Sequence, residues 1–156
     1  MVGLMAQAAP RIAVMILHLT SGEPPELDEL LKLYTSVGWT AYTRDPEALA
    51  RALRQSTFVW TARSGGGELV GLVRGMSDDV SLLFVQDILV CPDWQRRGVG
   101  RALMTAVLTR FAHVMQTVLL TDDGPEQLAF YESLGFQNTR DLSLNAFYRA
   151  SMQSGA

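Results

Sequence analysis

The amino-acid sequence predicts a mixed α/β fold in which helices cover both faces of a central sheet. Three observations support this prediction. Apolar runs of strand length recur along the chain, segments with helical spacing of apolar residues lie between them, and no repeat, low-complexity tract or linker interrupts the order. The expected succession is β-α-α-β-β-β-α-β-α-β-β. A chain of 156 residues is long enough for one domain with a substantial core.

The first elements are a strand and an amphipathic helix. Arg11–Leu19 is rich in Ile, Val and Leu, which are residues that strands favour. A helix beginning near Glu26 is predicted because apolar residues recur at the spacing i, i+3, i+4 and i+7, which is that of Leu27, Leu30, Leu31 and Tyr34. Val37 and Gly38 end it.

An aromatic loop, Trp39–Arg44, precedes a second helix. Asp45 as N-cap and Pro46 in the first turn open this short helix, which runs to about Gln55. Three apolar runs separated by turn residues then predict three strands, at Thr57–Arg63, Glu68–Met76 and Ser81–Val90.

The remaining elements alternate between helix and strand. The central helix is expected from Val99 to about Val114, and a short strand at Thr117–Leu120. The residues Asp122–Pro125 cap a helix that ends at Leu134, with Gly135 in the C′ position. Two further strands are expected at Phe136–Thr139 and Ser143–Tyr148.

Composition narrows the possible partners. The formal net charge of −3 argues against a nucleic-acid partner, which usually requires a basic face. Cys91 is the only cysteine, which rules out an intramolecular disulfide and fits a reducing cytoplasm. No apolar run reaches transmembrane length, so no membrane is expected, and no metal site is expected either. Residues 1–10 and 151–156 read as loose tails around a single domain at 11–150.

The run Gln95–Gly100 indicates a phosphate site. It follows an apolar strand, contains two glycines, and leads into a helix whose first N–H groups favour anions. A pyrophosphate is the ligand expected there. The dinucleotide pattern G-x-G-x-x-G fails at Leu103. The P-loop pattern fails as well, because the only lysine of the chain is Lys32.

Two ordered motifs resemble a known family. Gln95-Arg96-Arg97-Gly98-Val99-Gly100 matches the Q/R-x-x-G-x-G/A signature of the GNAT superfamily of N-acyltransferases, which use acetyl-coenzyme A. Phe130-Tyr131-Glu132-Ser133-Leu134-Gly135-Phe136 resembles the family's second signature. The resemblance is strong over Leu69–Phe136 and implies a central, mostly antiparallel sheet.

The resemblance also implies which residues hold the cofactor and take part in transfer. The cofactor-binding residues that it implies are Ile88, Leu89, Val90, Gln95, Arg96, Arg97, Gly98, Val99, Gly100, Arg101, Phe130 and Tyr131. The backbone N–H of Ile88 would polarise the thioester carbonyl, which is worth about 3 kcal/mol for a fixed donor. Tyr131 would protonate the departing thiolate, since a phenol with a pKa near 10 stays protonated at neutral pH.

The sequence does not single out one residue as the base that takes the amine proton. Asp87 is the candidate on the critical strand, although strand alternation would turn it away from the acceptor and leave Gln86 and Phe84 facing the pocket. Asp122 and Asp123 are interpreted as helix caps. A chain of water molecules without a single base is the remaining alternative.

The acceptor site is expected to have an aromatic lining. Its candidate residues are Trp39, Tyr42, Phe84 and Gln86. The loop and the following helix look like those of bacterial relatives of the plant plastid arylalkylamine (serotonin-type) N-acetyltransferases. That subgroup carries an Asp where this chain has Gly124, with Asp123 beside it.

The leading hypothesis is therefore acetyl transfer from acetyl-CoA to the primary amine of a small molecule, by direct attack in a ternary complex. Acetylation of a protein or peptide amine is an alternative within the same chemistry. An acyl-CoA-binding sensor or partner module without turnover is an alternative of another class, and a nucleotide-binding protein is a third. A homodimer is a further possibility.

Overall fold

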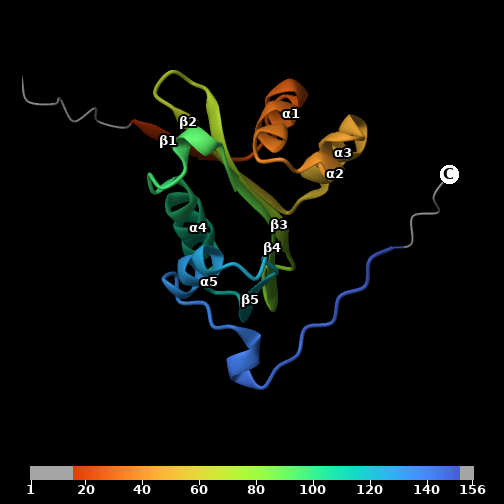
Figure 1. Ribbon diagram of the computed structural model, residues 1–156, viewed down its shortest axis with the longest axis vertical. Helices are drawn as coiled ribbons and strands as arrows, with labels where there is room; N and C mark the ends of the chain where they lie inside the picture. Colours follow the sequence, from red (N-terminus) through yellow and green to blue (C-terminus); the bar gives the residue numbers. More distant parts are fainter. Residues whose placement is uncertain (1–15, 152–156) are drawn as a thin grey trace, which may run out of the picture. The chain divides into compact units, whose positions relative to one another are not determined.

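The computed structural model describes residues 16–151, and Figure 1 shows its elements. The chain divides into two compact units, residues 1–118 and 119–156. The elements, in chain order, are β1 (Leu17–Ser21), α1 (Leu27–Ser36), α2 (Thr40–Thr43), α3 (Pro46–Gln55), β2 (Phe58–Ser64), β3 (Leu69–Ser77), β4 (Leu82–Val90), the 3₁₀ helix η1 (Pro92–Trp94), α4 (Val99–Arg110), β5 (Gln116–Leu119), α5 (Pro125–Glu132) and the 3₁₀ helix η2 (Thr139–Leu142).

The sheet has five strands in the order β1-β2-β3-β4-β5 (Figure 1). Each of the first three pairings is antiparallel. Between β3 and β4 the register shifts: Arg74 pairs with Asp87 and Gly75 with Val85. Gln86 is therefore an extra residue on β4, which makes a β-bulge at this point.

Helices pack on both faces of this sheet. Leu72 of β3 belongs to a buried cluster with residues of α1 and α3. A Cβ at the neighbouring Gly71 would instead meet Val99 and Leu103 of α4, at 3.0 and 3.1 Å. Because successive residues of a strand point to opposite faces, α1 and α3 cover one face and α4 the other. The predicted mixed α/β class with helices on both faces is confirmed.

The two N-terminal helices begin and end where local sequence signals place them. In α1 the buried residues are Leu30, Leu33 and Tyr34. Two of these belong to the predicted apolar face, whereas its other members, Leu27 and Leu31, are only partly buried. In α3 the carboxylate of Asp45 accepts a hydrogen bond from the Ala48 N–H at 3.0 Å. This contact satisfies one of the amides that a helix start leaves without an intrahelical partner.

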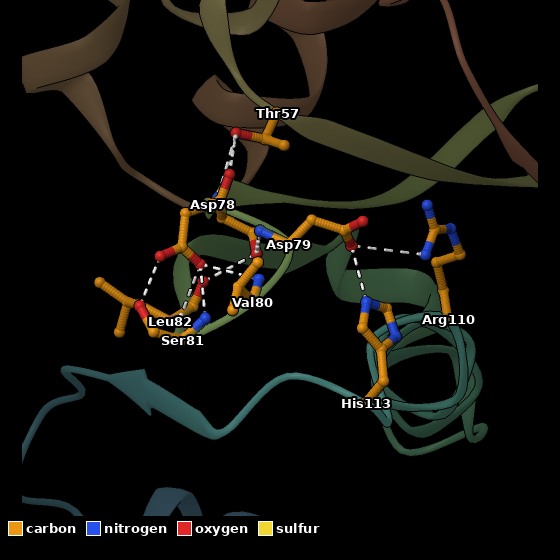
Figure 2. Close-up of polar contacts among 9 residues, drawn as sticks. Thr57, Asp78, Asp79, Val80, Ser81, Leu82, Arg110 and His113 are labelled. Atoms are coloured by element: carbon orange, nitrogen blue, oxygen red, sulfur yellow. Dashed lines mark hydrogen bonds and ion pairs between the residues drawn. The ribbon is translucent and has the colours of Figure 1, made fainter.

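The turn between β3 and β4 is built around Asp78 (Figure 2). Its Oδ1 accepts hydrogen bonds from the backbone N–H groups of Val80, Ser81 and Leu82 at 2.8 to 3.0 Å, and Ser81 Oγ donates to Oδ2. The hydrogen bond from the Ser81 hydroxyl, followed by those from the backbone amides, holds the pKa of the Asp78 carboxyl well below its usual value.

We expect Asp78→Asn to make the stability of the fold less sensitive to acid. A carboxyl whose pKa is lower in the folded than in the unfolded chain contributes stability that is complete above its unfolded pKa of about 4. That contribution is lost as the pH falls toward the folded value. Urea unfolding at several pH values between 3 and 7 should show a difference between parent and variant that is largest at pH 7 and shrinks toward pH 3. A difference independent of pH would contradict this role.

The next residue in the turn links it to the end of α4. Asp79, which has a φ of 62°, accepts from His113 Nε2 at 2.9 Å and lies 3.7 Å from Arg110 Nη1 (Figure 2). His113, which lies just beyond the end of α4, thus has a carboxylate partner on the β3–β4 turn.

Several element predictions were wrong. The expected loop Trp39–Arg44 contains the short helix α2, and the central helix ends at Arg110 rather than near Val114. Neither Phe136–Thr139 nor Ser143–Tyr148 forms a strand, and η2 lies between them. Apolar and aromatic composition favours a strand only where a partner strand is available.

The N-terminal strand and the tails are partly outside the described residues. Of the expected strand Arg11–Leu19, the last three residues lie in β1, and residues 11–15 are not among those described. The predicted tail 1–10 also lies outside, and of the predicted tail 151–156 only Ser151 is described. Among residues 16–151, no helix combines the length and the apolar character needed to cross a membrane.

Candidate active site

The turn between β4 and α4 ends in a glycine that leaves open space at the start of the helix. Gly98 is the N-cap of α4, and its φ of +83° lies in the left-handed region. No atom lies within 4 Å of the place where its Cβ would stand. The first helical hydrogen bond runs from Ala102 N–H to the Gly98 carbonyl at 2.9 Å. The amides of residues 99–101 therefore precede this bond, at the end of the helix that favours anions.

Side chains of this turn have partners within the protein. Gln95 Nε2 donates to the Val90 carbonyl at 3.0 Å, which ties the turn to the end of β4. The guanidinium of Arg97 lies over the ring of Trp94, 5.6 Å from its centroid. Arg96 adopts a φ of 60°, in the left-handed region. Gln95 and Arg97 thus contact other groups of the protein, and the phosphate site predicted at this turn stays a prediction.

The register of β4 fixes the direction of the Ile88 amide. Cys91 N–H donates to the Val70 carbonyl at 2.8 Å, which makes these two residues a hydrogen-bonded pair of the antiparallel ladder. Hydrogen-bonded and non-hydrogen-bonded pairs alternate in such a ladder. Ile88, three positions earlier and opposite Val73, is therefore in a non-hydrogen-bonded pair. Its N–H and C=O point away from β3.

β5 is the neighbour of β4 on that side, but it lines only the start of the strand. It begins beside Ser81, whose carbonyl accepts from Gln116 N–H at 3.2 Å. Its four residues span about 13 Å, whereas Ile88 is seven positions, or about 23 Å, beyond Ser81. The Ile88 amide thus lies past the reach of β5.

On the α1–α2 side of the sheet, β4 contributes to a buried polar group that we call the Asp87 cluster. It consists of Tyr34, Tyr42, Arg74 and Asp87. The Asp87 side chain, which is only 1% exposed, accepts from Tyr34 Oη at 2.9 Å, Tyr42 Oη at 2.7 Å and Arg74 Nε at 2.6 Å. Because Arg74 lies directly opposite Asp87 on β3, the buried carboxylate has both a counter-charge and three donors.

Both phenols of the Asp87 cluster are held in the protonated form. Burial raises the pKa of Tyr34 well above its usual value, and the charge of Asp87 raises it further. Burial, followed by the hydrogen bond to Asp87, raises the pKa of Tyr42 in the same way. Each hydroxyl can therefore donate to the carboxylate at neutral pH.

The two tyrosines of this cluster and the neighbouring Trp39 form what we call the aromatic wall, which consists of Tyr34, Trp39 and Tyr42. The Trp39 and Tyr42 rings stack at 5.9 Å with an interplanar angle of 29°, and the Tyr34 and Tyr42 centroids are 5.2 Å apart. Trp39 and Tyr42 are half-buried. The structure thus brings the predicted acceptor residues Trp39 and Tyr42 together, whereas Phe84 lies opposite Met76 in the sheet register.

The expected opposition of Gln86 and Asp87 is corrected by the bulge. Simple alternation places these neighbours on opposite faces of the strand. In the structure, Gln86 Nε2 donates to Tyr42 Oη at 3.3 Å, and the same hydroxyl donates to Asp87. Because Gln86 is the extra residue of the bulge, both side chains reach Tyr42.

Sequence reasoning missed Tyr34 and Arg74 as partners of Asp87. Tyr34 was assigned only to the apolar face of α1. Arg74 carried a usable signal, because it is a lone charge in the otherwise uncharged strand Leu69–Ser77. A buried charge requires a partner, and Asp87 is the acidic residue of the next strand.

The second unit holds Tyr131. Its ring contacts those of Phe130 and Phe136, with centroids 5.1 and 5.8 Å apart. Burial raises its pKa, and a hydrogen bond with Thr121 opposes this effect. The interpretation of Asp122 and Asp123 as helix caps is corrected here. Gly124 is the N-cap of α5, and no side chain caps that helix.

Asp123 has another partner in this unit, because Arg140 Nη2 donates to its Oδ1 at 3.0 Å. In the part of the chain that the structure describes, His, Cys, Asp and Glu side chains nowhere gather in threes suited to a metal ion.

Comparison with known proteins decides the family. The model of the acetyltransferase (GNAT) domain matches residues 55–138, which is more than half of the chain. The chain belongs to the GNAT acetyltransferase family. A solved GNAT-family acetyltransferase from Streptococcus pneumoniae is 31% identical, with a TM-score of 0.77, and the match covers 88% of this chain and 100% of that one.

A further relative and a further solved structure are similar to this chain. The chloroplastic serotonin N-acetyltransferase 2 of Oryza sativa subsp. japonica is 33% identical over 134 residues, which are 82% of this chain and 65% of the relative. An aminoglycoside N-acetyltransferase solved in complex with CoA is 18% identical, with a TM-score of 0.64 and coverage of 92% and 99%, and shares the fold. The chain is an acetyl-CoA-dependent N-acetyltransferase.

The residues of this GNAT domain fit acetyl-CoA. The place of a Cβ at Gly98 is open, and α4 begins there with amides that favour phosphate. The Ile88 amide points away from β3, which leaves it directed out of the β3–β4 ladder. A pyrophosphate at Gly98 and an acyl chain along the end of β4 would use main chain at both places.

We expect Gly98→Val to raise the Kd for acetyl-CoA by about tenfold or more, because its side chain would fill the open space at the start of α4. Isothermal calorimetry would measure the Kd. Gly67→Val is the matched control, since Gly67 also has a positive φ, of +87°, and no atom within 4 Å of its Cβ position. It lies in the β2–β3 turn. Equal loss of affinity in both variants would assign the effect to backbone strain rather than to loss of the phosphate site at Gly98.

Proposed function

We propose that this enzyme transfers an acetyl group from acetyl-CoA to the primary amine of a small aromatic molecule, by direct attack in a ternary complex. The observation that carries the proposal is the aromatic wall. Its ring Tyr42 is hydrogen-bonded to Asp87, the residue that precedes Ile88 on β4. An aromatic acceptor stacked there would have its amine near the backbone that is expected to polarise the acetyl carbonyl.

Three groups of this chain have proposed roles toward the donor. The turn Gln95–Arg101 and the first amides of α4 bind the pyrophosphate, and the backbone of Ile88–Val90 lines the acyl chain. Acetyl-CoA supplies an acyl thioester that an amine can attack. The Ile88 N–H stabilises negative charge on the thioester oxygen, for which a fixed donor contributes about 3 kcal/mol.

The proposed acid is Tyr131. Its hydroxyl holds a proton that the leaving thiolate needs, and a pKa raised by burial keeps that proton in place at neutral pH. The residues Phe130 and Phe136 fix the ring by their contacts. The identity of the relative described as serotonin N-acetyltransferase supports the choice of an aromatic amine over other acceptors.

A panel of amines tests the proposal. CoA release would be measured with arylalkylamines, aliphatic diamines, aminosugars and a lysine-containing peptide, each at several concentrations. We expect the highest kcat/KM for an arylalkylamine. Preference for the peptide would indicate that the enzyme acetylates proteins. Preference for a diamine or an aminosugar would show that the aromatic wall does not recognise the acceptor.

A further inference from the structure

We propose that Asp87 is a positioning residue of the acceptor site, whose buried carboxylate holds Tyr42 and thereby fixes the aromatic wall against β4. This inference rests on the proposed function, because it assigns a role within the site that binds the aromatic amine. It differs from a role for Asp87 as the base that removes the amine proton.

Asp87 is buried, and its hydrogen-bond partners hold it in place, as a positioning residue requires. Both of its oxygens accept hydrogen bonds: Oδ2 from Tyr34 and Arg74, and Oδ1 from Tyr42. The Asp87 side chain is 1% exposed, and that of Arg74 opposite it is 8% exposed. A base must come within hydrogen-bond reach of the acceptor's proton. Here the Tyr42 hydroxyl already occupies Oδ1.

Tyr42 is the member of the Asp87 cluster that reaches the surface of the site. Its hydroxyl donates to Asp87 and accepts from Gln86 Nε2, and its ring stacks on Trp39. One hydroxyl thus joins the buried carboxylate, the bulged residue of β4 and the wall. The bulge makes this possible, because it lets Gln86 and Asp87 reach the same side of the sheet.

The short helix α2 depends on this contact for its position. It has four residues, Thr40–Thr43, and none of them is buried. Tyr42 is partly buried and packs against the core cluster, which includes Leu33 and Leu89. A helix this short is held by tertiary contacts rather than by its own hydrogen bonds. Loss of the bond to Asp87 should therefore loosen α2 and the Tyr42 ring together.

The experiment compares Tyr42→Phe, Asp87→Asn and their double variant with the parent enzyme. A hydrogen bond to a charged group is strong enough that either single change should raise the KM for the best arylalkylamine by about tenfold. The kcat and the KM for acetyl-CoA should stay within about threefold. The double variant should be no worse than the poorer single variant, because both changes remove the same bond.

Hydrogen exchange supplies a readout that does not depend on turnover. The amides of residues 40–43 should exchange at least about tenfold faster in Tyr42→Phe than in the parent enzyme. Tyr34→Phe is the control, because it removes the inner hydrogen bond to Asp87 and leaves that of Tyr42. Because Tyr42 is only half-buried, we expect Tyr42→Phe to fold. This variant therefore tests the proposal even if Asp87→Asn fails to fold.

The outcomes distinguish the proposed function, acetylation of an aromatic amine, from the positioning role of Asp87. If no aromatic amine is acetylated but exchange in α2 accelerates, the proposed function fails and the anchoring of Tyr42 by Asp87 stands. If exchange in α2 is unchanged and the arylalkylamine KM is unchanged, Asp87 is not a positioning residue. A kcat that falls by about 10²-fold in Asp87→Asn, with loss of the acidic limb of the pH profile, would make Asp87 the base and overturn the inference.

Discussion

Tyr131→Phe is expected to lower kcat by about 10²-fold or more while the Kd for acetyl-CoA stays near that of the parent enzyme. The change removes one oxygen and keeps the ring, so the contacts with Phe130 and Phe136 remain. Only the proton available to the departing thiolate is lost. Steady-state kinetics would measure kcat, and calorimetry would measure the Kd.

The pH profile adds a second readout for the same residue. An acid must be protonated to act, so the rate should be high below the pKa of Tyr131 and fall as the pH rises through it. Because burial raises that pKa above its usual value of about 10, the fall belongs to the alkaline end of the profile. Tyr148→Phe is a matched control, since Tyr148 is an 80% exposed tyrosine of the same unit. Activity equal to the parent's in Tyr131→Phe at every pH would leave Tyr131 a packing residue, with thiolate protonation by water.

The elements that sequence predicted well are those specified by neighbouring residues. The helix α3 begins at Pro46 because Asp45 caps it, and both signals lie within a few residues of each other. The elements missed are those that depend on distant partners. Ser143–Tyr148 has strand-forming residues, yet Phe147 is 96% exposed and the segment has no regular structure. Strand propensity reports packing against neighbours, which a local pattern does not contain.

The candidate site likewise has one part that neighbouring residues specify and another that depends on distant elements. The turn at Gly98 could be predicted because its chemistry is that of a local backbone motif, and the left-handed φ of this glycine agrees with it. The partners of Asp87 come from α1, α2 and β3, and no spacing in the sequence joins them. The bulge at Gln86 breaks the alternation that was expected to place Gln86 and Asp87 on opposite faces of the strand. Such a bulge is an event of pairing between two strands, so one strand alone does not reveal it.

Gly75→Ala is expected to destabilise the fold by about 2 to 4 kcal/mol, a large share of the 5 to 15 kcal/mol typical of a domain. Gly75 lies at the bulge, on β3 opposite Val85. A Cβ there would collide with the backbone carbonyl oxygen of Phe84 and lie 2.6 Å from Cζ of Phe58. Phe58 is buried against Phe111, with ring centroids 5.1 Å apart, so its ring has little room to move.

Urea unfolding followed by circular dichroism would measure this loss. Gly66→Ala is the control, because a Cβ at Gly66 would meet only Ser64 Oγ, at an ordinary 3.8 Å, and its effect should stay within about 0.5 kcal/mol. If Gly75→Ala were as stable as this control, β3 and β4 would have to separate at the bulge to admit the methyl group. That separation would move Gln86 and Asp87 relative to Tyr42, so a stable Gly75→Ala variant should instead show the raised arylalkylamine KM expected of Tyr42→Phe. The bulge thus couples the packing of the sheet to the acceptor site, because Gly75 lies at the bulge without space for a Cβ and the extra residue Gln86 reaches the same tyrosine hydroxyl as Asp87.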